Sequence, residues 1–156
     1  MSGRQPLVTE KLRAVLDTNV PVAAHLSVNP NSPAVELIER WRRGEFMQLY
    51  SDDTIAELEE KLTEKGIGSE AVEEYLSDLA KFGVHVKVGP EDIEPVIPAD
   101  PDDDLIVACA VVGGATHCDL RPPLRGPGRG TQKGIEIVDG LAFLRRVRGE
   151  ELTEGS

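Results

Sequence analysis

Residues 14–20, AVLDTNV, place an acidic turn directly after an apolar run. The apolar residues predict a buried strand, and Asp17 follows at the point where this strand leaves the sheet. Open α/β sheets bind ligands at the carboxyl ends of their strands, so a carboxylate at this position is a candidate site residue. Asp and Asn are also common in turns and at helix starts. From this segment alone, a functional role and a capping role for Asp17 are equally well supported.

The composition is that of one globular domain. The chain has 156 residues, enough to bury a core of its own, and its aromatic content of 4% predicts a mainly aliphatic core. No apolar run is long enough to span a bilayer and the first ten residues lack a signal-peptide core, which predicts a cytoplasmic protein without membrane contact. The formal net charge of -11 argues against nucleic-acid binding through bulk charge, but it does not exclude a local basic patch.

Apolar spacing and turn residues predict strands that alternate with helices between residues 13 and 148. The predicted strands are 14–16, 46–50, 84–88, 115–120 and 135–138. The predicted helices begin near Ser32, Ser51, Ser69, Asp104 and Asp139, and a loop is expected between the first strand and Ser32. This alternation implies an α/β fold with a mostly parallel sheet covered on both faces. Residues 1–12 and 149–156 are polar without a period, which predicts a flexible arm and a flexible tail.

Acidic residues fall at comparable places in this plan. Asp17 ends the first strand and Asp104 opens a buried helix, so both can lie at one edge of a parallel sheet. Glu57 and Glu59 flank the apolar stripe of the helix after the second strand, and spacing alone does not choose between them. The run 102–104 also suits a helix start favoured by the macrodipole, an interpretation that we prefer for its first two residues but not for Asp104.

Clustered carboxylates repel one another unless a shared proton or a cation neutralises them. Oxygen-rich sites with few protein ligands suit Mg²⁺ or Mn²⁺. Such an ion activates water and stabilises charge on a phosphoryl group. Metal-assisted phosphodiester hydrolysis is therefore the chemistry that this arrangement fits best.

Several segments together resemble the PIN domain family, and the likeness extends over nearly the whole chain. Residues 15–20 resemble the opening strand and metal-binding turn of that family, and residues 54–58, TIAEL, resemble its second motif. Residues 100–110 are similar to the third motif, and residues 113–117 and 134–138 resemble the flanks of the last two strands. Each motif is modest by itself, but their order and spacing are specific.

The resemblance implies a set of site residues. Asp17, Glu57 and Asp104 would be both catalytic and metal-binding, with Glu57 preferred to Glu59. Asn19 would orient one carboxylate or a water molecule. The other implied supporting residues are Thr18, Ser27, Thr54, Asp103 and Asp119.

The resemblance further implies a three-layer α/β/α fold and a ribonuclease that depends on Mg²⁺ or Mn²⁺. It implies an RNA substrate, the frequent role of a toxin in a bacterial toxin-antitoxin pair, an antitoxin protein as partner, and a homodimer. The alternative function is a PIN-like module that binds RNA or protein with weakened or lost catalysis.

The chain departs from the family pattern after the fourth predicted strand. The family usually has Thr or Ser, then Gly, then an Asp that completes the acidic pocket, but residues 118–123 read CDLRPP. Asp119 comes too early for that place, and residues 121–133 are dense in Pro, Gly and Arg without a period. One explanation is true divergence, which weakens the nuclease. The other is a local change of reading frame, which the coding DNA would reveal.

Overall fold

The computed structural model describes residues 12–93, 101–119, 131–132, 135–138 and 140–149. Its sheet has the strand order β3-β2-β1-β4-β6-β5. The strands are β1 (Leu12–Val15), β2 (Phe46–Tyr50), β3 (Val84–His85), β4 (His117–Asp119), β5 (Thr131–Gln132) and β6 (Ile135–Val138). Among the strand pairs that the structure describes, only β5 with β6 is antiparallel. The prediction of a mostly parallel sheet is confirmed.

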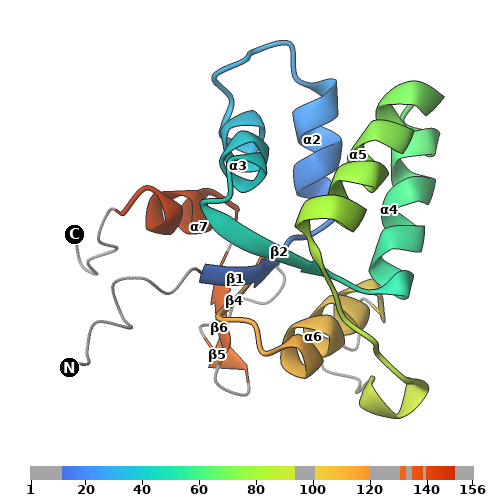
Figure 1. The fold of residues 1–156 in the computed structure, drawn as a ribbon, viewed down its shortest axis with the longest axis vertical. Coiled ribbons are helices and arrows are strands. Elements are labelled where there is room, and N and C mark those ends of the chain that lie inside the picture. The colour runs from blue at the N-terminus through green and yellow to red at the C-terminus, as the bar shows by residue number, and fades with distance from the viewer. Residues whose placement is uncertain (1–11, 94–100, 120–130, 133–134, 139, 150–156) are drawn as a thin grey trace.

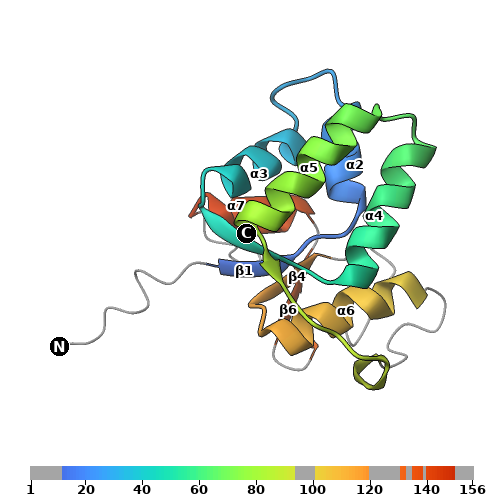
Figure 2. The same ribbon diagram turned by 45° about the vertical axis from the view of Figure 1, so that its right-hand side comes forward.

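Helices cover both faces of this sheet. They are α2 (Asn19–Leu26), α3 (Pro33–Arg42), α4 (Asp52–Glu64), α5 (Ser69–Phe82), α6 (Pro101–Gly113) and α7 (Gly140–Val147), with a short 3₁₀ helix at Pro90–Asp92. Figures 1 and 2 show α2, α3, α4, α5 and α7 on one side of the strands and α6 on the other. The predicted three-layer α/β/α arrangement is therefore confirmed.

Alternation along the first strand separates two hydrophobic cores. Ala14 and Leu16 pack in one core with Trp41 of α3, whereas Val15 packs in the other with Ile106 of α6. Each face of the sheet thus has its own buried layer.

Serine caps start two of the helices where the sequence predicts them. The Ser32 hydroxyl accepts a hydrogen bond of 3.2 Å from the backbone N–H of Val35 at the start of α3. Ser51 and Thr54 form a reciprocal capping box at the start of α4, with distances of 3.2 and 2.8 Å. The helix α5 begins at Ser69 itself, one position after its cap Gly68.

The helix α2 replaces part of the predicted loop before Ser32. Pro21 lies in its first turn, where a missing N–H costs no hydrogen bond, so this proline does not prevent the helix. The helix is short and buries only Pro21 and Val22, and it packs against α3. The sequence of α2 carries no apolar stripe at helical spacing. We therefore attribute its stability to packing against α3 and not to an amphipathic pattern.

Two further boundaries differ from the prediction. The strand expected over 84–88 is limited to Val84–His85, since its partner β2 ends at Tyr50, before the α4 cap. The helix α6 begins at Pro101, so Asp104 lies one turn into the helix rather than at its first position.

Some predictions fall on residues outside the described ranges. Residues 1–11 and 150–156 make up most of the predicted arm and tail. The predicted helix cap Asp139 also lies outside the described ranges. In the part of the chain that is described, no helix has the length and apolar character needed to cross a bilayer.

Candidate active site

Strand pairing brings two aspartates to one edge of the sheet. The strands β1 and β4 are parallel neighbours, and Val15 is in register with Cys118. Asp17 follows β1 by two residues and Asp119 is the last residue of β4. Both are therefore at the carboxyl ends of adjacent strands, where open α/β sheets bind ligands.

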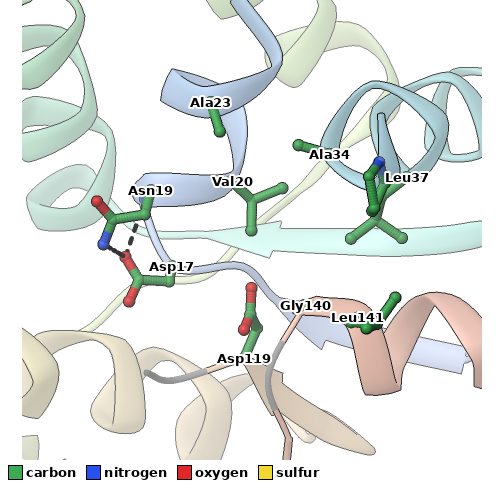
Figure 3. Close-up of a pocket in the computed structure, with 10 residues that line it drawn as sticks. Asp17, Asn19, Val20, Ala23, Ala34, Leu37, Asp119, Gly140 and Leu141 are labelled. Carbon is green, nitrogen blue, oxygen red and sulfur yellow. Dashed lines mark hydrogen bonds between the residues drawn. The ribbon is translucent and has the colours of Figure 1, made fainter. Parts of the chain in front are cut away.

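Asp17 and Asp119 line the same pocket, which has a volume of about 300 Å³. The pocket lies above the strand ends and is enclosed by α2, α3 and α7, as Figure 3 shows. Both aspartates are buried, with exposed fractions of 5% and 2%. The carboxylates occupy one end of the pocket, and apolar side chains form most of the rest.

Asn19 holds the carboxylate of Asp17 in one orientation. Its backbone N–H and its side-chain Nδ2 both donate to Asp17 Oδ1, at 2.9 and 2.8 Å. Figure 3 shows both hydrogen bonds as dashed lines. No described residue donates a hydrogen bond to Asp17 Oδ2, so this oxygen is available to a ligand. The predicted orienting role of Asn19 therefore has a geometric basis.

Helix N-termini lie close to both carboxylates. Asp17 comes two residues before the start of α2. A Cβ atom built on Gly140, the first residue of α7, would lie 3.7 Å from Asp119 Oδ2. The N-terminal end of a helix carries a partial positive charge, which stabilises nearby carboxylates. This placement helps to explain how two buried acids can share one pocket.

The family pattern suggests only a supporting role for Asp119, because this residue comes early relative to that pattern. The structure nevertheless gives it the same pocket as Asp17. Chain spacing could not show this, because the side-by-side pairing of β1 and β4 decides which strand ends meet. The sequence signal that could have found it is the short predicted strand over 115–120, which ends next to this acid.

Glu57 and Asp104 do not line this pocket. Glu57 lies on α4 with its Oε1 atom buried, whereas Glu59 is exposed, so α4 turns the predicted glutamate toward the protein. Asp104 is 9% exposed and lies on α6, which contacts α4. Among the described residues, no three acidic, His or Cys side chains are grouped closely enough to hold a metal ion. The ligand set of Asp17, Glu57 and Asp104 stays a prediction.

The remaining predicted residues have other surroundings. Thr18 and Thr54 are buried and line a second cavity of about 20 Å³ between α2 and α4. Ser27 follows the far end of α2 from Asn19, where its hydroxyl and the backbone of Asn29 exchange hydrogen bonds of 3.1 Å. Asp103 is part of α6, but its side chain is outside the described part of the structure.

The two cysteines are buried in the core. Cys109 is fully buried and Cys118 is 1% exposed. Burial raises the pKa of the Cys109 thiol to about 12, and a hydrogen bond with Ser51 acts in the opposite direction. A thiol that stays protonated and inaccessible is no nucleophile, so cysteine chemistry does not belong to this site.

The donor set of the pocket fits a hard divalent cation. Mg²⁺ is commonly held by one or two carboxylates, with water and substrate phosphate completing its shell. Asp17 and Asp119 line one pocket, and their carboxylates would provide such a pair of oxygen ligands. Asn19 adds an amide beside them.

Comparison with known proteins identifies the family of the chain. The family model of the PIN domain matches residues 13–117, well over half of the chain. The match ends two residues before Asp119, at the point where the sequence departs from the family pattern. No curated protein matches the chain. PIN domains are generally nucleases and typically use divalent metals, and this chain belongs to the PIN domain family.

Proposed function

We propose that the protein is a divalent-metal-dependent ribonuclease that hydrolyses RNA phosphodiester bonds. One observation carries this proposal: two buried carboxylates, Asp17 and Asp119, line one pocket at the strand ends of a PIN domain. The chain has a net charge of -11 and two carboxylates line the pocket, so a bound cation would reduce the repulsion of an RNA phosphate. Mg²⁺ and Mn²⁺ are the ions that suit these ligands.

In this proposal Asp17 Oδ2 and Asp119 would hold the ion. The ion, when bound, would supply an activated water and neutralise charge that develops on the phosphate. Asn19 keeps Asp17 in its orientation through Oδ1.

A cleavage assay tests the proposal. A fluorescent single-stranded RNA and a DNA of the same sequence are incubated with Mg²⁺, with Mn²⁺ and with EDTA. We expect RNA cleavage only in the presence of metal, and a loss of more than about 100-fold in Asp17→Asn and Asp119→Asn, since removal of a direct ligand should exceed the effect of an outer-shell change. Asp53→Asn, an exposed acid on α4, is the matched control. Full activity in Asp17→Asn would refute the site.

A second pair of variants distinguishes the two possible ligand sets. If Glu57 and Asp104 complete the set, as predicted from the family resemblance, Glu57→Gln and Asp104→Asn lose activity as severely as Asp17→Asn. If Asp17 and Asp119 hold the ion without Glu57 and Asp104, Glu57→Gln and Asp104→Asn keep most of their activity. Only the variants of Asp17 and Asp119 then lose it. The concentration of Mn²⁺ at half-maximal activity is measured in each case.

The alternative function is a binding module with weakened or lost catalysis. The end of the family match at residue 117 favours it, because the usual fourth motif follows that point. Residues 120–130, where that motif would lie, are outside the described ranges. A calorimetric titration with Mg²⁺ and Mn²⁺ separates the two functions, and an absence of binding at millimolar concentration would favour the module. Sequencing of the coding DNA decides between true divergence and a changed reading frame.

The proposed biological role is that of a cytoplasmic toxin that forms a homodimer and is neutralised by an antitoxin protein. Family resemblance alone supports this part. Induced expression should arrest growth, and co-expression of a small protein encoded next to the gene should relieve the arrest. Growth unaffected by active enzyme would argue against the toxin role.

A further inference from the structure

The pocket extends well beyond its two carboxylates. Val20 of α2 and Ala34 and Leu37 of α3 form an apolar wall, as Figure 3 shows. Pro33 and Leu141 also line the pocket and are exposed, which leaves apolar surface open to solvent at its mouth.

We infer that this apolar part binds the nucleobase next to the phosphodiester bond that is cleaved, an inference that rests on the proposed function. A phosphate bound at Asp17 and Asp119 has a ribose and a base as its nearest neighbours in RNA. The ribose carries hydroxyl groups, so the faces of the base are the apolar surface nearest to the phosphate. The volume of about 300 Å³ is at the lower end for ligand pockets, which suits one base rather than a folded segment of a protein.

The lining residues also predict how the base is recognised. Among the described residues that line the pocket, Asn19 is the only one besides the two aspartates with a polar side chain, and its Nδ2 already donates to Asp17. No aromatic side chain lines the pocket in the described part of the chain, so the base lies between aliphatic groups. Selection then depends on the size and apolar area of the base more than on hydrogen bonds to its edges. We expect a preference at one nucleotide beside the cleaved bond.

Binding of nucleosides tests the inference without any need for metal or cleavage. Adenosine, guanosine, cytidine and uridine, with ribose as the reference, are titrated at millimolar concentration in EDTA. The methyl NMR signals of Val20, Leu37 and Leu141 report on binding. At least one nucleoside should shift these signals and bind about tenfold or more tightly than ribose, because only the nucleoside buries a base. Equal binding of ribose and of all four nucleosides, or no shift with any of them, overturns the inference.

Filling the pocket provides the matched variant. Ala34→Leu places a larger apolar side chain in the cavity and should abolish both the nucleoside shifts and the nucleotide preference in RNA cleavage. Ala80→Leu makes the same change at an exposed position of α5 and should alter neither. The inference is overturned if Ala34→Leu binds nucleosides as tightly as the unchanged protein does. This holds even if the variant changes its oligomeric state.

A milder variant guards against misfolding. Leu141 is 47% exposed, so Leu141→Ser removes apolar wall at the mouth of the pocket with little effect on the core, and Leu26→Ser, at a residue 50% exposed, is its control. Leu141→Ser should weaken nucleoside binding several-fold, and the control should not.

Two outcomes distinguish this inference from the proposed function. Base-dependent binding without any RNA hydrolysis would refute the ribonuclease activity but not the base pocket. Hydrolysis with unchanged nucleotide preference in Ala34→Leu would refute the base pocket alone.

Discussion

At the scale of single residues, the orientation of Asp17 depends on its neighbour two positions along the chain. Both hydrogen bonds from Asn19 reach the same carboxylate oxygen, so the other oxygen is directed away from them. An Asx-type turn of this kind is local and forms wherever the short polar side chain meets the following backbone N–H. The segment 14–20 therefore carries both the acid and the group that holds it.

Replacement of this asparagine tests the orienting role. Asn19→Ala should raise the Mn²⁺ concentration needed for half-maximal RNA cleavage by about 10-fold to 100-fold, as for other groups that orient a metal ligand. Thermal stability should change little because Asn19 is exposed. The control is Asn31→Ala, another exposed asparagine, in the loop between α2 and α3. A variant that loses stability but keeps its metal dependence would mean that Asn19 is merely structural.

At the scale of elements, an ion-pair network joins two of the helices that enclose the pocket. Arg148, just after α7, donates to both carboxylate oxygens of Glu36 on α3, and Arg40 of the same helix donates to Glu36 at 2.8 Å. The hydrogen bonds from Arg148, followed by those from Arg40, lower the pKa of Glu36 from 4.5 to about 2. The network thus depends on an ionised Glu36.

This network predicts a stability contribution that depends on pH. Because the pKa of Glu36 is lower in the folded protein than in the unfolded chain, the contribution is complete above about pH 5 and is lost as the pH falls toward 2. Glu36→Gln should lower the free energy of unfolding by about 1–2 kcal/mol at pH 7, after allowance for partial exposure, and by much less at pH 2. Urea denaturation at both pH values measures this, with Glu39→Gln, at a more exposed position of α3, as control. An equal loss at both pH values would contradict the role of charge.

At the scale of the whole molecule, the layer beneath the sheet depends on close packing of α6. Among the described helices, only α6 covers that face. Gly113 ends this helix against the sheet, and a Cβ atom there would lie 2.5 Å from Leu49 Cδ2 and 2.8 Å from Val86 Cγ2. Such distances require side chains of the core to move.

Gly113→Ala should therefore destabilise the protein by about 1–3 kcal/mol, as overpacking of a core commonly does. Gly140→Ala is the control, since a Cβ there makes ordinary contacts of 3.5 Å with Val20 Cγ2 and 3.7 Å with Asp119 Oδ2. Thermal unfolding compares the two variants. Equal stability of both variants would show that the side chains around Gly113 rearrange at little cost in free energy.

Prediction from sequence succeeded where local signals are strong. The helices α3, α4 and α5 and the strands β2 and β6 lie where apolar spacing and caps predict them. The helix α2 was missed because tertiary packing, not a local period, stabilises it. The strand β3 was overpredicted because a strand ends where its partner ends, which its own alternation cannot reveal.

The sequence by itself determined the α/β class, the order of most elements, and the position of Asp17 at the end of the first strand. These features follow from local periodicity and turn chemistry, which depend on near neighbours in the chain. Only the tertiary structure decided that Asp119 shares a pocket with Asp17, and that α2, α3 and α7 add an apolar wall to it. Those contacts join residues far apart in sequence, so they depend on the order in which strands pair and helices pack.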